Sequence, residues 1–122
     1  MRERPVVLYL QDIADAGYAI RSYVSGLSFD DFIRDRMRQS AVIREFEVIG
    51  EAVGRLPDNL KALHPDIPWR EIKDFRNLLI HAYFGVDLWI VWNTIEQELP
   101  ALLAAVDERL KAIGEDPRQN MA

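Results

Sequence analysis

One short segment of the sequence gathers the residue types that can do chemistry. It reads DFRNLLIHAYFG, from Asp74 to Gly85, and carries Arg76, Asn77, His81 and Tyr83 among apolar residues. A histidine can act as an acid or a base near neutral pH, because its ordinary pKa is about 6.5. An arginine offers a permanently charged, bidentate fork for a phosphate. The segment is either a catalytic constellation or an amphipathic helix with several polar residues on one side.

Helical geometry separates the two residues with the strongest chemistry. At about 100° per residue, Asn77 and His81 are neighbours on the polar side, whereas Arg76 projects from within the apolar side. Arg76 and His81 then stand about 140° apart and cannot meet by adjacency on one helix. Either the arginine curls around, the helix unwinds near His81, or the site is assembled across a symmetric dimer.

A guanidinium on an apolar face needs solvent, a cavity or a carboxylate partner. The candidates for an ion pair with Arg76 are Glu47 and Glu51 on the preceding helix, and the sequence does not choose between them. The simplest interpretation is an amphipathic helix with a buried ion pair at Arg76 and a solvated histidine at His81. Structural ion pairs often resemble functional sites in this way.

The elements that must position these residues are helices, because apolar residues recur at helical spacing almost throughout. We expect an all-α fold, an antiparallel bundle of four or five helices in a single domain over residues 1–122, with a frayed tail over 113–122. Ile33 should face inward with Phe29 and Phe32, and Gly26 should form a left-handed cap. One helix should begin near Pro5 and a second should follow Ser28, and three more should span Gln39–Arg55, Pro68 to His81 or Tyr83, and Leu88–Ile113. The turn-rich connection before Pro68 should hold at most a short helix across Asn59–Leu63. The last helix should be capped by Asp87 and broken or kinked at Pro100.

Composition excludes several classes of site and partner. The chain has 122 residues, is 49% hydrophobic and contains no cysteine, so disulfides and thiolate zinc sites are excluded. The net charge of −5 disfavours nucleic-acid binding by bulk electrostatics, and leaves a local basic patch or a site completed by a second chain. The N-terminal apolar run is too short and too polar for a signal peptide or a membrane span, so we expect a cytoplasmic protein.

Other conspicuous residues have ordinary structural explanations. His64 has no neighbouring ligand types, so we predict no metal site there. Trp69, Trp89 and Trp92 are expected to serve core or interface packing. The basic run Arg34–Arg38 is diluted by nearby aspartates and is more typical of a solvated face.

The segment RNLLIHAY has the form R-x(4)-H-x-Y and resembles the signature of the HepT toxins, in the HEPN superfamily of helical RNase domains. The resemblance extends over LYLQDIADAGYAIRSYVSGLSFDDF, IREFEVIGEAVGRLP, HPDIPWREIKDFRN and FGVDLWIVWNTIEQELPAL, in that order. Together these segments run from about Val6 to about Leu110. The combination is more specific than the short arginine–histidine motif.

This resemblance implies an all-helical HEPN-like bundle that forms a homodimer, with the motif helices of two subunits framing a cleft. It implies a ribonuclease toxin that needs no metal or other cofactor, with Arg76 and His81 as the catalytic pair and Asn77 in support. The reaction would be attack of the RNA 2′-hydroxyl on the adjacent phosphate. The implied partner is an MNT-type nucleotidyltransferase antitoxin that transfers AMP to Tyr83.

Two other functions stay open at the level of sequence. The chain could be a non-catalytic subunit that binds a nucleotide or substrate for a partner nucleotidyltransferase. It could also be a helical dimer without a site. The presence of both Arg76 and His81 favours catalysis, because binding alone needs no titratable group.

Overall fold

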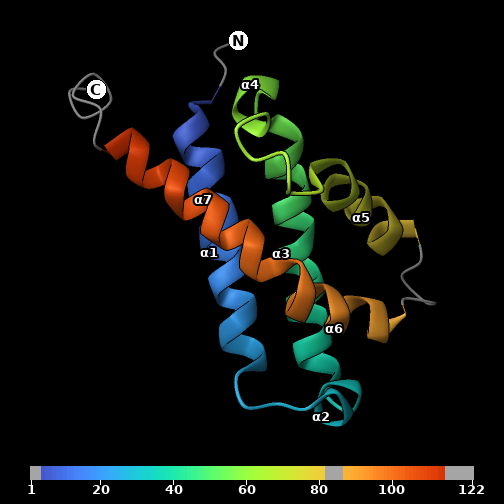
Figure 1. The fold of residues 1–122 in the computed structure, drawn as a ribbon. Coiled ribbons are helices and arrows are strands. Elements are labelled where there is room, and N and C mark those ends of the chain that lie inside the picture. The colour runs from blue at the N-terminus through green and yellow to red at the C-terminus, as the bar shows by residue number, and fades with distance from the viewer. Residues whose placement is uncertain (1–3, 82–86, 115–122) are drawn as a thin grey trace.

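The computed structural model describes residues 4–81 and 87–114, and this part of the chain is helical, with no strand (Figure 1). The fold class predicted from periodicity is therefore confirmed. Seven helices lie in the described ranges, where four or five were expected, because two are short and the last predicted helix is divided. They are α1 (Val6–Val24), α2 (Phe29–Ile33), α3 (Arg36–Arg55), α4 (Asp58–Lys61), α5 (Trp69–His81), α6 (Leu88–Gln97) and α7 (Leu99–Gly114).

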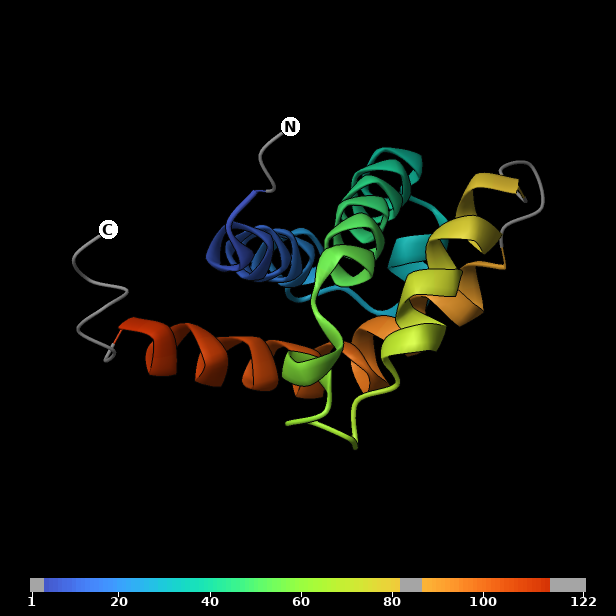
Figure 2. The same ribbon diagram turned by 90° about the horizontal axis from the view of Figure 1, so that it is seen from above.

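The two longest helices, α1 and α3, form an antiparallel hairpin at the centre of the molecule (Figure 1). Seen from above, α3 lies between α1 and α5, while α7 and α6 run across one side (Figure 2). The core fills the space between these layers with aliphatic and aromatic side chains, and burying them supplies most of the driving force for folding. Its fully buried larger members include Leu10, Ile13, Ile20, Phe32, Ile49, Leu99, Leu103 and Val106.

Local capping explains where the second and third helices begin. Ser28 and Asp31 form a capping box, in which the Asp31 N–H donates to Ser28 Oγ at 3.1 Å and the Ser28 N–H donates to Asp31 Oδ2 at 2.9 Å. The long third helix begins at Arg36 rather than at the predicted Gln39. Asp35 is its N-cap, since the Asp35 carboxylate accepts from the Arg38 N–H at 3.0 Å.

Gly26 has the predicted left-handed backbone, with φ of 76°, and lies two residues beyond the end of α1. The prediction for Ile33 is wrong, because its side chain is 42% exposed. The helix α2 ends after little more than one turn, so Ile33 lies at its last position and does not continue the inward face of Phe32.

The C-terminal helical pattern divides at the predicted proline. α6 ends at Gln97, and Pro100 occupies the first turn of α7, where a missing N–H costs no helical hydrogen bond. Asp87 is the N-cap of α6, as expected, and accepts from the Trp89 N–H at 2.9 Å. The first two residues of the expected frayed tail, 113 and 114, are helical and end α7, and the rest of the tail lies outside the described residues.

Aromatic contacts attach α2 to α6. The Phe29 and Trp89 rings meet edge to face with centroids 5.1 Å apart, and the Phe32 and Trp92 centroids are 5.3 Å apart. Trp92 is buried, whereas Trp89 is 54% exposed despite its contact with Phe29. None of the helices in residues 4–81 and 87–114 combines the length and apolarity that a membrane crossing requires.

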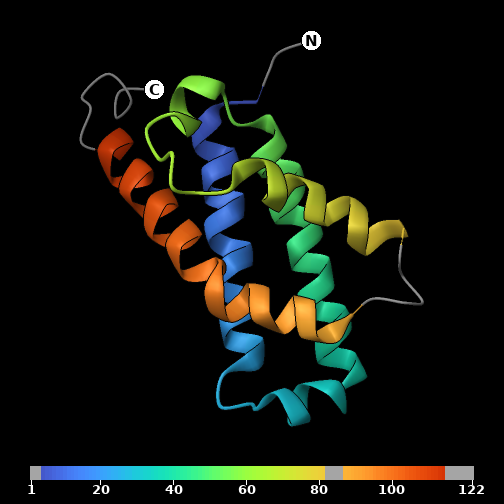
Figure 3. The ribbon, with the colours of Figure 1, turned by 45° about the vertical axis from the view of Figure 1, so that its right-hand side comes forward.

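The helix that carries the motif, α5, packs chiefly against α3 (Figure 3). On its other side, α5 faces α6 and the start of α7 across an apolar pocket of about 260 Å³. The motif helix is thus supported mainly by one neighbour.

Candidate active site between α3 and α5

Arg76 lies against the backbone of α3, and a glycine makes room for it. A Cβ atom at Gly50 would stand 2.6 Å from Arg76 Cβ, which is closer than real carbon atoms approach. Gly50 is buried in the middle of α3. The position predicted to be anomalous, an arginine on the inward side of α5, is therefore accommodated by the absence of a side chain on α3.

The Arg76 guanidinium then reaches Glu51, the neighbour of Gly50. Arg76 Nη2 lies 3.6 Å from Glu51 Oε2, while the other candidate, Glu47, lies 3.9 Å from Arg44 Nη1. The ion pair is not buried, because the Arg76 and Glu51 side chains are 38% and 50% exposed. Solvent therefore screens the pair, so it contributes little to stability and leaves the guanidinium accessible.

A second cation of α5 repeats this arrangement one turn away. Gly54 follows Gly50 at helical spacing on α3, and a Cβ atom at Gly54 would lie 3.4 Å from Lys73 Cε. Lys73 and Arg76 thus lie across two glycines of α3. Arg55, at the end of α3, adds a third cation, with its Nη2 3.3 Å from Glu51 Oε1.

These side chains line a pocket of about 270 Å³ between α3 and α5, which we call the cationic pocket. It contains three cations against one carboxylate, so its local charge is positive although the whole chain carries −5. Asn77 adds a carboxamide that can donate or accept. The lining residues are Gly50, Glu51, Gly54, Arg55, Lys73, Arg76 and Asn77.

Arg76 also borders a second polar pocket, of about 300 Å³, between α1 and α3. There the charges balance, since Arg4, Arg44 and Arg76 face Asp12, Glu47 and Glu51. Arg4 pairs with Asp12 and lies 4.9 Å from the centroid of the Tyr9 ring. An anion gains little from a balanced pocket, so the cationic pocket is the better phosphate site of the two.

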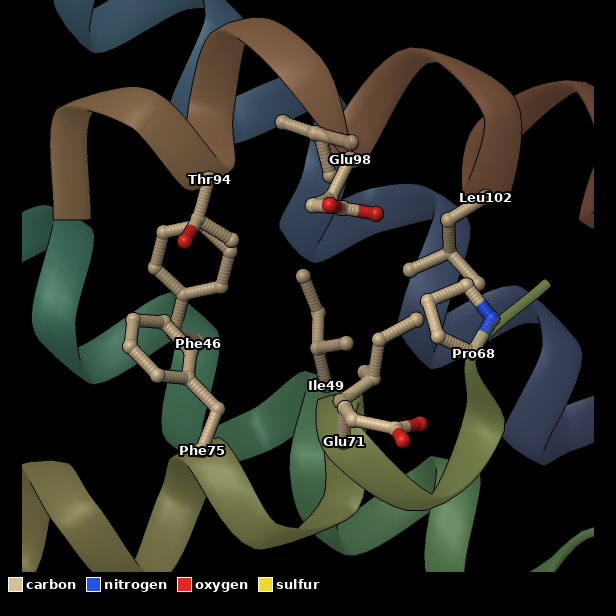
Figure 4. Close-up of a pocket in the computed structure, with 10 residues that line it drawn as sticks. Phe46, Ile49, Pro68, Glu71, Phe75, Thr94, Glu98 and Leu102 are labelled. Atoms are coloured by element: carbon tan, nitrogen blue, oxygen red, sulfur yellow. The ribbon is translucent and has the colours of Figure 1, made fainter. Parts of the chain in front are cut away.

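The apolar pocket on the other side of α5 has the wrong chemistry for a phosphate. Phe46, Ile49 and Phe75 form its walls, and the Glu71 and Glu98 carboxylates lie on either side of it (Figure 4). Both carboxylates would repel an anion. Within residues 4–81 and 87–114, no three histidine, aspartate or glutamate side chains gather where they could hold a metal ion.

The structure places part of the sequence-predicted site. Arg76, Asn77 and Glu51 line one pocket, and Glu47 lies in the balanced pocket on the far side of Arg76. Position 81 is the last residue of α5, one turn beyond Asn77. The His81 side chain and the whole of Tyr83 lie outside the described residues, so the distance between Arg76 and His81 stays untested.

Sequence reasoning did not identify Gly50, Gly54, Arg55 or Lys73 as parts of this site. A signal was present, because two glycines four residues apart inside a helix cost stability and therefore indicate close packing. Lys73 and Asn77 share the same spacing on α5. The sequence did not show that the face of α3 with the two glycines packs against the face of α5 with Lys73 and Asn77.

Comparison with known proteins identifies the family of the chain. Residues 13–109 match the family described as "Ribonuclease HepT-like". The chain is 48% identical over 94 residues to a protein named "Probable ribonuclease HepT" from Thermococcus cleftensis, covering 77% of this chain and 86% of that protein. It is 42% identical over 103 residues to a protein named "Putative RNase TTE0752" from Caldanaerobacter subterraneus, covering 84% and 92% of the two chains. No solved structure matches. The chain therefore belongs to the ribonuclease HepT-like family.

Proposed function

We propose that this protein is a metal-independent endoribonuclease and the toxin of a toxin–antitoxin pair. The observation that carries the proposal is membership of the HepT-like family with Arg76, Asn77, His81 and Tyr83 all present in the motif. The accessible guanidinium of Arg76, bordering a positively charged pocket, supports it. The relatives' names refer to ribonuclease activity, which we extend to this chain as part of the proposal.

In the proposed reaction, His81 takes the proton of the RNA 2′-hydroxyl as that oxygen attacks the adjacent phosphorus. Arg76 and Asn77 bind the non-bridging phosphate oxygens, on which negative charge develops. The bond from phosphorus to the 5′-oxygen breaks, and an imidazolium returns a proton to that oxygen. The products are a 2′,3′-cyclic phosphate end and a free 5′-hydroxyl end.

The proposed active form is a homodimer. A symmetric pair brings two arginines and two histidines into one cleft, which removes the need for Arg76 to meet His81 on its own helix. Sedimentation analysis should give twice the chain mass of 14.1 kDa. A monomer that retains full activity would contradict the shared cleft.

The decisive test compares the two histidines of the chain. His81→Gln should abolish growth arrest and cleavage of cellular RNA, whereas His64→Gln, in the connection before α5, should retain both. Cleavage by the wild type should persist in excess EDTA. If the intact wild-type dimer cuts no RNA and arrests no growth, the nuclease proposal fails and a non-catalytic binding subunit becomes the better explanation.

We propose further that an MNT-type nucleotidyltransferase antitoxin silences the toxin by transferring AMP to Tyr83. An anionic adduct beside the cleft would obstruct RNA and offset the charge of Arg76. Intact mass after co-expression should show added AMP on the wild type and none on Tyr83→Phe. The remaining tyrosines, Tyr9, Tyr18 and Tyr23, serve as internal controls, and an adduct that survives Tyr83→Phe would sink the assignment.

A further inference from the structure

We infer that the cationic pocket between α3 and α5 is a binding subsite for an RNA phosphate next to the one that is cleaved, with Arg55 and Lys73 as its principal cations. The inference rests on the proposed ribonuclease function and adds a substrate contact outside the motif.

The first support is the way in which the cations are held. Lys73 Cγ, Cδ and Cε lie 3.4–3.7 Å from where a Cβ of Gly54 would stand, and Arg76 lies closer still to Gly50, so both long side chains run along α3. A stem held in this way loses less rotamer freedom on binding a ligand than a free surface lysine does. Arg55 closes the pocket from the end of α3.

The second support is the position of the Glu51 carboxylate. It accepts from Arg55 at 3.3 Å and lies 3.6 Å from Arg76, so it sits between two guanidinium groups in the way a phosphate would. Half of the Glu51 side chain is exposed, and it can therefore rotate into solvent when an RNA phosphate takes its place. Arg55 and Lys73 then face this phosphate, while Arg76 is left to the phosphate that is cleaved.

The third support is the direction in which the pocket leads. Lys73, Asn77 and position 81 follow one another at four-residue spacing on α5. Eight residues, a little over two helical turns or about 12 Å, separate positions 73 and 81 along the axis. An RNA strand cut beside His81 can therefore extend along this edge of α5 into the pocket. The net charge of the chain is negative and disfavours RNA binding as a whole. The cationic pocket offsets this locally, because it concentrates positive charge where the strand would run.

The experiment measures binding separately from cleavage. A fluorescein-labelled, fully 2′-O-methylated RNA of mixed sequence has no 2′-hydroxyl to attack, so it reports binding alone. Its dissociation constant for the full-length protein is measured by fluorescence anisotropy over a series of salt concentrations. The variants are Arg55→Gln, Lys73→Gln and the double variant. The controls remove the same charges elsewhere: Arg36→Gln at the opposite end of α3, about 28 Å from Arg55, and Lys111→Gln on α7.

Each pocket variant should weaken binding about threefold to fivefold, and the double variant about tenfold or more. The slope of log affinity against log salt should fall by about 0.7 for each phosphate contact removed. Arg55→Lys and Lys73→Arg, which keep the charge, should retain most of the affinity. Urea midpoints should stay close to the wild-type value, because the altered side chains are exposed.

If Arg55→Gln and Lys73→Gln bind this RNA as the two controls do, or if the wild type does not bind it at all, the inference is overturned. The outcome for the proposed function is read independently, from cleavage of ordinary RNA. If the protein binds the methylated strand through Arg55 and Lys73 but cuts no RNA, the subsite is supported and the nuclease proposal fails.

Discussion

At the scale of single residues, the position of Arg76 is set by a residue that has no side chain. Gly50 allows α5 to approach α3 so closely that Arg76 Cβ occupies the space of the missing side chain. Because the contact is made by Cβ, Arg76 cannot avoid a new neighbour by changing rotamer. Only a shift of the helix could relieve it.

The different surroundings of Gly50 and Gly54 predict opposite effects for alanine substitutions at these two positions. Gly54→Ala should raise the free energy of unfolding by roughly 0.5–1 kcal/mol, because it removes a glycine from a helix and meets only the flexible end of Lys73 at 3.4 Å. Gly50→Ala should lower it by about 1–2 kcal/mol, since overpacking outweighs the same gain. Urea unfolding measures both. Equal stabilisation of the two variants would contradict the close approach at Gly50.

A second prediction concerns the sign of the Glu51 charge. Glu51→Gln should strengthen binding of the methylated RNA about twofold to fivefold, because it removes the one carboxylate among three cations. Stability should change by less than about 0.5 kcal/mol, since the pair is exposed. Anisotropy and urea unfolding check the two effects. Weaker binding would mean that the carboxylate is needed to hold Arg76 in place.

At the scale of helices, the starts of α2 and α3 depend on ionised carboxylates. Hydrogen bonds from Ser28 lower the pKa of Asp31, and hydrogen bonds from Arg38 lower the pKa of Asp35, both from an ordinary value of 3.8. At pH values between the lowered folded pKa values and 3.8, the unfolded chain therefore binds more protons than the folded chain. The stabilisation from both caps is present above about pH 3.8 and is lost as the pH falls through the lower, folded pKa values.

Replacing both carboxylates should therefore reduce the loss of stability at low pH. Asp31→Asn with Asp35→Asn keeps oxygen acceptors at both caps but removes their titration. The urea midpoint of this variant should fall less than that of the wild type as the pH is lowered below about 4. Asp30→Asn, on the exposed side of α2, is the matched control. If the urea midpoint falls equally with pH in the wild type, the double variant and Asp30→Asn, the two caps are not the source of the pH dependence.

The helices also show what the sequence could and could not predict. Strong apolar periodicity and capping residues predicted α1, α3, α5 and α6, and Pro100 marked the division before α7. The start of α3 was missed by three residues, because Asp35 caps the helix inside a segment that lacks apolar periodicity. Ile33 was misplaced because α2 is too short for its pattern to repeat.

The partner of Arg76 needed information that no single helix contains. Glu47 and Glu51 are one turn apart on α3, so the choice depends on how far α5 is displaced along α3. The contact of Arg76 with Gly50 fixes that displacement and selects Glu51. The cationic pocket was unpredictable for the same reason, since each of its walls is an ordinary polar helix face until the two are paired.

At the scale of the whole molecule, the hairpin of α1 and α3 is a scaffold to which α5 is attached along one side only. The apolar pocket of about 260 Å³ takes the place of tight packing between α5 and the α6–α7 layer. Side chains that line this open pocket have no protein atoms on the side that faces it and lose those dispersion contacts. We therefore expect separation of α5 from the rest to cost less free energy than separation of α1 from α3.

Amide hydrogen exchange should reveal this difference. Amides in α5 should exchange through local opening at a smaller free energy than amides near the buried Ile13 and Ile20 in α1, which should exchange only on global unfolding. Mass spectrometry of peptic peptides, measured against denaturant concentration, separates the two regimes. Equal protection and equal denaturant dependence in α1 and α5 would mean that the domain opens as one unit.

A separately opening α5 would give the protein two levels of cooperativity within one small domain. In the proposed ribonuclease, the helix that carries Arg76 and Asn77 would then adjust its tilt to a bound strand while α1 and α3 stay paired. Accommodation of differently shaped RNA would draw on a small local free energy and leave the global stability of the fold unchanged.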